Sequence, residues 1–247
     1  MKYWTSMALI ACAALAEDVA RGDEIRIAVA ANFVVVLEDL ATRFESTSEH
    51  EVLLSSGSTG GHYAQIRNGA PFEAFFGADV ARPALLEQEG RIVPGSRFTY
   101  ALGRIALWSA SVGYVDGDKV LEHGDFRFLA IANPELAPYG AAAREVLMGL
   151  GLWEGLQDRL VQGQDIGQTL SFVHTRAAEL GFVAYSQLRN PEAPVDGSYW
   201  LVPESMHAPI EQQAVLLKDV QAAREFLEFV QSAEGAEIIR SYGYGLP

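Results

Sequence analysis

The chain has 247 residues and a formal net charge of -14 at pH 7, from 32 acidic and 18 basic side chains. Hydrophobic residues make up 49% of it and charged residues 20%, a composition that excludes a disordered or fibrous chain and allows one large core or two smaller ones. So acidic a chain is poorly suited to bind nucleic acid or an anionic membrane surface, because both partners are negatively charged.

The N-terminal segment 1–16 differs from the rest of the chain. Lys2 is its only charge, and an apolar run from Met7 to Ala16 ends in Ala-Leu-Ala, which predicts a secretory signal peptide. The run is shorter than the roughly 20 apolar residues that span a bilayer. Cys12 is the only cysteine, so no intramolecular disulfide can form. It lies in a Leu-Ile-Ala-Cys sequence that resembles a lipobox, so a lipid anchor at Cys12 stays an alternative, as does an ordinary N-terminal helix.

The remaining chain alternates strand and helix patterns. Apolar and polar residues alternate over 24–30 and predict a strand, and apolar residues three or four apart then predict a helix as far as Ser46. Such alternation predicts an α/β protein with mainly parallel sheets. The further predicted strands are 51–55, 73–77, 104–109, 127–132, 181–186 and 212–217, and the further predicted helices are 61–68, 81–88, 141–150, 167–179 and 220–240.

Common catalytic and metal-binding motifs are absent from the sequence. The five histidines have no spacing typical of a zinc site, and no cysteine accompanies them. The sequence has no Gly-Lys dipeptide, hence no P-loop, and neither a G-x-G-x-x-G nor a G-x-S-x-G motif. We therefore expect no metal-cation site and no enzyme of these classes.

Four predicted strand-to-helix junctions carry groups that could bind an anion. The loop 55–61, Ser-Ser-Gly-Ser-Thr-Gly-Gly, exposes N–H groups and hydroxyls at the start of a helix, although a turn with an ordinary N-cap explains it equally well. Asn32, Tyr139 and Ile166 lie at the other junctions, where they could instead be a cap, a packed aromatic ring and a core side chain. Because ligands of open α/β sheets bind beyond the carboxyl ends of the strands, the four junctions could converge on one small oxyanion.

These segments together resemble the periplasmic molybdate- and tungstate-binding proteins of ABC importers. Their order and spacing carry the resemblance, which covers nearly all of the chain after about residue 25. The matching segments are 30–33, 37–41, 55–61, 65–71, 75–79, 94–100, 107–109, 131–134, 137–140, 167–168 and 180–183.

The resemblance implies an α/β fold of the type II periplasmic binding proteins: two lobes, each a mainly parallel sheet flanked by helices, with the ligand in the cleft between them. We expect residues 24–101 and 211–247 to form one lobe and residues 102–210 the other. The implied ligand is molybdate or tungstate, with no cofactor and no enzymatic activity. The implied partners are an ABC permease and an ATPase, and the processed protein is expected to be a periplasmic monomer without direct membrane insertion.

By position, the resemblance implies five residues that contact the oxygens of the oxyanion: Asn32, Ser58, Thr59, Tyr139 and Ile166. Thr59 is expected to supply its hydroxyl and its N–H, with Ser58 beside it, Tyr139 a hydroxyl and Ile166 a backbone N–H. The subgroup with a tyrosine in the 137–140 loop has threonine where this chain has Ala31, which removes one hydroxyl from the expected set.

Three alternatives stay open at the level of sequence, one of which is a sensory or adhesive domain of this fold that has lost transport. The same fold could bind another tetrahedral oxyanion, sulfate or phosphate. The loop 55–60 also resembles the phosphate loop of adenylate-forming enzymes, which would make the chain a nucleotide-phosphate-binding enzyme. In those enzymes Pro-Lys-Gly follows the loop, whereas Gly61-His62-Tyr63 follows it here.

Overall fold

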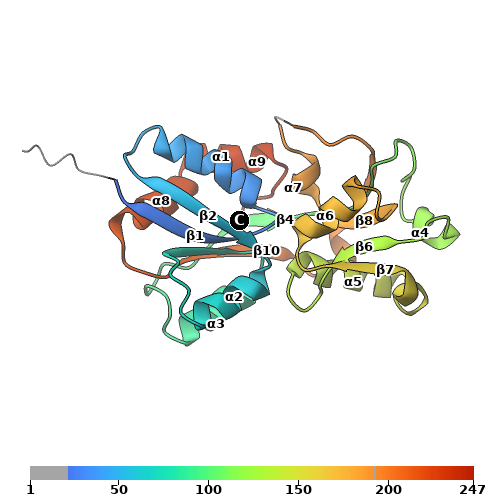
Figure 1. The fold of residues 1–247 in the computed structure, drawn as a ribbon, viewed down its shortest axis with the longest axis horizontal. Helices are drawn as coiled ribbons and strands as arrows, with labels where there is room; N and C mark the ends of the chain where they lie inside the picture. Colours follow the sequence, from blue (N-terminus) through green and yellow to red (C-terminus); the bar gives the residue numbers. More distant parts are fainter. Residues whose placement is uncertain (1–21, 192) are drawn as a thin grey trace, which may run out of the picture.

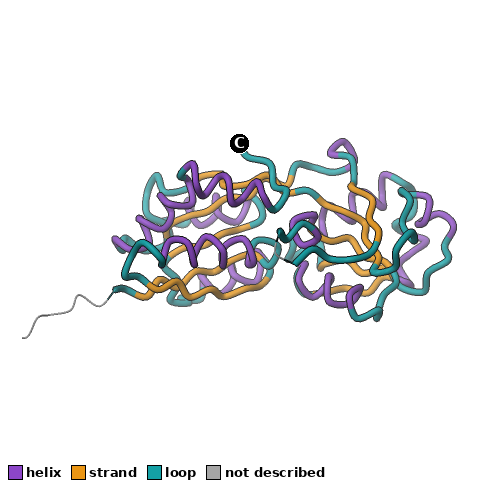
Figure 2. The backbone as a smooth tube through the Cα atoms, turned by 90° about the horizontal axis from the view of Figure 1, so that it is seen from above, coloured by secondary structure: helices purple, strands orange, loops and turns teal. Residues whose placement is uncertain are grey.

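The computed structural model describes residues 22–191 and 193–247, so the predicted signal peptide 1–16 and Cys12 lie outside the described residues. Two five-stranded sheets, each flanked by helices, lie side by side along the long axis of the molecule (Figures 1 and 2). We call them, with their helices, the first and second lobes. In the described part of the chain, every helix is too short or too polar to cross a membrane.

The first lobe consists of strands β1 (Glu24–Ala30), β2 (Glu51–Gly57), β3 (Ala74–Gly77), β4 (Phe98–Gly103) and β10 (Ile210–Leu216) and helices α1 (Val34–Glu45), α2 (Thr59–Arg67), α3 (Ala81–Gln88), α8 (Gln221–Gln231) and α9 (Ala233–Ser241). Its strand order is β2-β1-β3-β10-β4, in which β1 is parallel to β2 and β3, and β10 is antiparallel to both neighbours. Helices α1, α8 and α9 cover one face of this sheet, and α2 and α3 cover the other (Figure 1).

The second lobe consists of strands β5 (Ile105–Ser109), β6 (Leu129–Ala132), β7 (Leu160–Gly163), β8 (Leu180–Ala184) and β9 (Ser198–Leu201), helices α4 (Lys119–His123), α5 (Pro138–Gly149), α6 (Ile166–His174) and α7 (Tyr185–Leu188), and 3-10 helices at Glu154–Arg159 and Glu204–Met206. The strand order is β7-β6-β8-β5-β9, with β6 parallel to β7 and β8 and β5 antiparallel to its neighbours. Separate apolar cores lie on its two faces, one with α5 and one with α6. This arrangement confirms the predicted α/β fold with two lobes.

Several predicted elements have different bounds in the structure. The predicted helix 167–179 was too long: it ends at His174, and Arg176 has a positive φ of 60° that no α-helix continues. The predicted helix 220–240 is two helices, because Ser232 leaves the helical conformation and its side chain caps α9 by accepting from Gly235 N. The predicted strand 127–132 begins only at Leu129.

Three of the strands in the described chain were not predicted. They are β4, β7 and β9, three of the four edge strands of the two sheets; the fourth edge strand, β2, was predicted. Two of them have only four residues, too few for a clear alternation of apolar and polar side chains.

The chain passes between the lobes twice. The first crossing is Arg104, between β4 and β5, and the second is the segment 202–209, between β9 and β10. Gly245 and Leu102 exchange two backbone hydrogen bonds of 2.8 and 3.0 Å, so the C-terminal segment lies against the first crossing (Figure 1). The predicted lobe boundaries at 101/102 and 210/211 stay a prediction about which residues move together.

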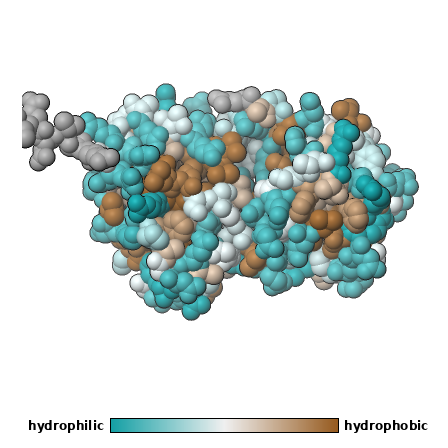
Figure 3. Space-filling view, in the orientation of Figure 1, coloured by the Kyte–Doolittle hydropathy of each residue, from teal (hydrophilic) through white to brown (hydrophobic). Residues whose placement is uncertain are grey.

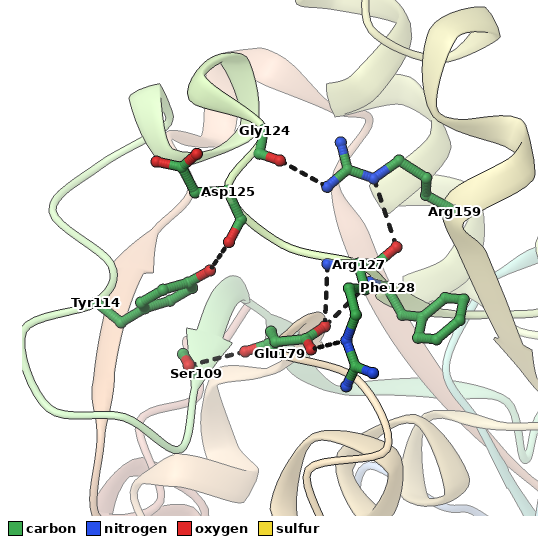
Figure 4. A network of polar contacts seen from close by, with 8 residues as sticks. All are labelled: Ser109, Tyr114, Gly124, Asp125, Arg127, Phe128, Arg159 and Glu179. Atoms are coloured by element: carbon green, nitrogen blue, oxygen red, sulfur yellow. Dashed lines mark hydrogen bonds and ion pairs between the residues drawn. The ribbon is translucent and has the colours of Figure 1, made fainter.

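A polar network closes the end of the second lobe where β6 and β8 begin (Figure 4). The Glu179 carboxylate accepts from the backbone N–H groups of Arg127 and Phe128 and from Arg127 Nε, while Arg159 donates to the carbonyl oxygen of Gly124 at 2.8 Å. Burial raises the pKa of Glu179, but the hydrogen bonds from Phe128 and Arg127 outweigh it and hold this pKa below its usual value. The carboxyl ends of β6 and β8 lie at the opposite end of the lobe and face the first lobe.

Candidate anion-binding site

The carboxyl ends of β1 and β2 meet those of β6 and β7 at a small cavity between the lobes. Its volume is about 10 Å³, room for about one water-sized group and far below the roughly 300 Å³ of the smallest pockets for drug-sized ligands, so in this closed arrangement it is too small for a nucleotide. All five residues predicted to bind an oxyanion lie in its wall. The lining residues are Ala30, Ala31, Asn32, Gly57, Ser58, Thr59, Ala78, Ala137, Pro138, Tyr139, Asp165 and Ile166.

Three helices begin at this cavity. Thr59 and Ile166 are the first residues of α2 and α6, and Tyr139 is the second residue of α5. The first N–H groups of a helix have no acceptor within the helix, and those of these three residues bond to no other group in the described chain. Since the aligned peptide dipoles place partial positive charge at each helix start, the three N–H groups together favour an anion.

Ser58 and Thr59 add two hydroxyl groups. Ser58 caps α2, its Oγ accepting from Gly61 N at 3.2 Å. Thr59 is 1% exposed, and its Oγ1 accepts from Ala78 N at 3.0 Å. A hydroxyl has one proton besides its acceptor positions, so each can still donate one hydrogen bond to a ligand.

Asn32 lies in the cavity wall, but its side-chain donors bond within the protein. Nδ2 donates to Gln212 Oε1 at 2.7 Å and to the Tyr244 hydroxyl at 2.9 Å. These bonds use both protons of the amide and fix the loop between β1 and α1. The ring of Phe33, 4.5 Å from that of Tyr100, packs the same loop onto the core of the first lobe.

The Tyr139 hydroxyl lies deep, toward the first crossing between the lobes. It accepts from Gln212 Nε2 at 3.3 Å, and a Cβ atom at Gly103 would overlap it. Burial, with the neighbouring hydroxyls of Tyr244 and Tyr100, raises the pKa of Tyr139 well above its usual value, so the group remains a hydrogen-bond donor. The predicted hydroxyl contact of Tyr139 with the ligand stays a prediction, and the structure adds the backbone N–H of the same residue as a second donor.

Ile166 is buried, and its backbone N–H is the group that α6 presents to the cavity. The preceding residue, Asp165, caps α6 by accepting from Gln168 N at 2.9 Å. Among the described residues, Asp165 is the only charged one in the cavity wall, and neither a lysine nor an arginine lines it. Across the described residues, no group of three His, Cys, Asp or Glu side chains could hold a metal ion.

Hydrogen bonds join the lobes on two sides of the cavity. On one side, Gly60 N donates to the Leu136 carbonyl at 2.8 Å and Arg82 Nη2 donates to the Glu135 carbonyl at 2.7 Å. On the other side, Ser186 Oγ lies 2.9 Å from the Tyr244 hydroxyl. The lobes are thus closed around the cavity.

The sequence prediction did not include Asp165, Gln212, Tyr100 and Tyr244 among the site residues. Gln212 and the two tyrosines come from β10, β4 and the C-terminal segment, and no local motif marks them. Asp165 does carry a signal, since it precedes a predicted helix three residues before Gln168, as an N-cap does.

Two α/β lobes closed on a small cavity with helix N-termini in its wall define a solute-binding protein of the two-lobed class. The model of a protein family described as bacterial extracellular solute-binding protein matches residues 25–245. The chain belongs to this family of bacterial extracellular solute-binding proteins.

Curated relatives and solved structures support this assignment. The chain is 49% identical over 242 residues to the molybdate-binding protein ModA of Azotobacter vinelandii, covering 96% of this chain and 94% of the relative. It is 44% identical over 243 residues to ModA of Rhodobacter capsulatus, covering 97% and 94%. The solved periplasmic molybdate-binding protein of Azotobacter vinelandii superimposes with a TM-score of 0.87 at 43% identity, covering 90% of this chain and 99% of that one. The sulfate-binding protein SubI of Mycobacterium tuberculosis, with a TM-score of 0.75, 10% identity and coverages of 91% and 87%, shares the fold alone.

Proposed function

We propose that this protein captures molybdate or tungstate outside the cytoplasm and delivers it to an ABC importer. The observation that carries the proposal is the convergence of three helix N-termini and two hydroxyls on a cavity whose described lining residues include no cationic side chain. Relatives of nearly the same length, at 49% and 44% identity, are molybdate-binding proteins, which supports this ligand over sulfate, phosphate or a nucleotide.

Neutral donors suit a ligand that is fully deprotonated. Molybdate and tungstate are dianions whose four oxygens all accept hydrogen bonds. Hydrogen phosphate carries a proton, which would point at a donor of the cavity and leave it unpaired, at a cost of roughly 1–3 kcal/mol for each such group. The Asp165 carboxylate adds repulsion toward any anion, so the helix N-termini and hydroxyls must outweigh it.

Size provides the second basis for selectivity. The donors sit on elements of both lobes, held by the cross-lobe bonds at Gly60 and Ser186. A closed set of fixed donors cannot contract around sulfate, whose tetrahedron is smaller than that of molybdate. We therefore expect tungstate, which is close to molybdate in size, to bind comparably and sulfate to bind more weakly.

The proposed role is binding and delivery rather than catalysis. The exported protein acts as a periplasmic monomer, and its partners are a permease and an ATPase. Hydrophilic side chains cover much of the face shown in Figure 3, with separate apolar patches on the two lobes.

The two lobes, divided at 101/102 and 210/211, would open and close by a hinge motion at the two crossings.

Thermal unfolding of the exported protein with molybdate, tungstate, sulfate or phosphate tests the proposal. A ligand at 100 times its Kd adds about 2.7 kcal/mol to the free energy of unfolding. For a protein of this size, at about 2–4 °C per kcal/mol, the Tm should rise by roughly 5–11 °C. We expect this rise with molybdate and tungstate. A rise with sulfate or phosphate alone would overturn the proposed ligand, and no rise with any of the four would overturn the oxyanion site.

A further inference from the structure

One buried side chain connects the two walls of the cavity. Gln212, in β10, is 0% exposed, and its Oε1 accepts from Asn32 Nδ2 at 2.7 Å and lies 3.0 Å from the Tyr100 hydroxyl. Its Nε2 donates to the Tyr139 hydroxyl at 3.3 Å. Asn32 belongs to the β1–α1 loop of the first lobe, and Tyr139 belongs to α5 of the second. A single amide therefore holds one element of each lobe.

The backbone around Gln212 is adapted to these contacts. The register between β10 and β4 shifts between Gln212 and Gln213, and the extra residue lies in β4: it is Tyr100, whose hydroxyl donates to Gln212 Oε1 at 3.0 Å. At the end of β4, next to the first crossing, a Cβ atom at Gly103 would lie 2.8 Å from Gln212 Nε2 and would overlap the Tyr139 hydroxyl. Only a glycine leaves room for the contact between these two side chains.

The surrounding hydroxyls continue the same network. Tyr244 OH donates to the Asn32 carbonyl oxygen at 2.8 Å and lies 2.9 Å from Ser186 Oγ, a second lobe-to-lobe contact. Burial raises the pKa of Tyr244 to about 12, although its hydrogen bonds with Ser186 and Asn32 lower it. Every member of the network is thus neutral. Its hydrogen bonds therefore depend on the positions of the donors and acceptors rather than on charge.

We propose that Gln212 is a positioning residue for oxyanion binding, a role that rests on the proposed function. By bonding Asn32 and Tyr139 at once, it holds the start of α5 against the β1–α1 loop, so that the Tyr139 N–H stays in the cavity wall with those of Thr59 and Ile166. When the lobes separate, Tyr139 moves away with the second lobe and Gln212 Nε2 loses its acceptor. The amide therefore favours the closed arrangement, and a ligand that binds only this arrangement gains affinity from it.

The test is Gln212→Met, which keeps the length of the side chain and removes both polar groups. We expect the Kd for molybdate, measured by calorimetry, to rise about tenfold, because Asn32 and Tyr139 each lose a buried partner. Stopped-flow measurements should place the change mainly in a faster dissociation, since the closed arrangement is what Gln212 stabilises.

The matched control is Gln213→Met in the same strand. Gln213 bonds to Arg97 Nη1 at 2.7 Å and to Thr99 Oγ1 at 3.1 Å, and it lies outside the cavity wall. The variant Gln213→Met should lower the Tm and leave the Kd for molybdate and the dissociation rate unchanged. A double-mutant cycle of Gln212→Met with Tyr139→Phe should show a combined loss of affinity smaller than the product of the two separate losses.

The outcomes separate the positioning role from a structural one. If Gln212→Met only lowers the Tm and dissociates from molybdate at the wild-type rate, the positioning role is overturned while the proposed function stands. If the wild-type protein binds none of the four oxyanions, both fall. If Gln212→Met does not fold, Gly103→Ala takes its place, because it adds one methyl group against Gln212 Nε2 and the Tyr139 hydroxyl. Molybdate should dissociate faster from this variant, and a wild-type dissociation rate would overturn the positioning role.

Discussion

The substitution Thr59→Val isolates one hydroxyl of the cavity. Valine has nearly the shape of threonine, so the variant removes a polar group without opening a cavity. In the structure, Thr59 Oγ1 accepts from Ala78 N at 3.0 Å, and its proton is available to the ligand. The variant should therefore lose both stability and affinity, and the two losses can be measured separately.

The magnitudes follow from these two contacts of Thr59. Without Oγ1, the buried N–H of Ala78 has no acceptor, which costs about 1–3 kcal/mol of the free energy of unfolding. That corresponds to a Tm lower by roughly 2–12 °C in the ligand-free protein. A hydrogen bond to a charged ligand contributes about 1.5–3 kcal/mol, so the Kd for molybdate should rise roughly 10- to 150-fold.

Calorimetric titration and thermal unfolding of the same preparations check both figures. The control is Thr99→Val in β4, because Thr99 also bonds through its hydroxyl, to Glu211 and Gln213, but lies outside the cavity wall. It should lower the Tm and leave the Kd unchanged. An unchanged Kd in Thr59→Val, with the lower Tm present, would refute the inference that this hydroxyl faces the anion.

Three further outcomes are expected. Ala31→Thr should lower the Kd for molybdate up to about tenfold by adding a hydroxyl to the cavity wall, whereas Ala31→Val, of the same shape, should not; equal Kd values in a titration of both variants would contradict this. The association rate of molybdate, followed by stopped flow, should rise with salt concentration, because a net charge of -14 repels a dianion and salt screens that repulsion; a falling rate would indicate a cationic approach path. Glu179→Gln should lower the free energy of unfolding by about 1 kcal/mol at pH 7. Because the folded-state pKa of Glu179 lies below its unfolded value, this difference should be present above the unfolded-state pKa and disappear as the pH falls through the folded-state pKa, and denaturant titrations with a pH-independent difference would refute it.

The sequence predicted the strand-to-helix junctions well because they are local features. Ser58 shows its role within three residues, as a serine that caps a helix at Gly61 N. The break at Ser232 is equally local but was missed, because the apolar spacing of α8 and α9 continues across it. The regular apolar spacing predicts one continuous helix and does not reveal that Ser232 caps a second one.

The polar network behind the cavity could not be predicted, because it depends on contacts between distant parts of the chain. Asn32 is 180 residues from Gln212 and 212 residues from Tyr244. In the sequence, Gln212 and Gln213 are adjacent and chemically identical. Because neighbouring side chains of a strand point to opposite faces of the sheet, Gln212 bonds to Asn32 and Tyr139 while Gln213 bonds to Arg97, and only the register of β10 in the folded sheet decides which glutamine faces which way.

The cross-cleft bonds at Gly60 and Arg82 both end on main-chain carbonyl oxygens, those of Leu136 and Glu135. A carbonyl oxygen is present whatever side chain follows it, so residues 135 and 136 can change during evolution without loss of these acceptors. Homologues could therefore diverge in this loop and still close in the same way. The residues on the two sides of the cleft would then rarely change together. Comparative sequence analysis would therefore underestimate how tightly the two lobes are joined here.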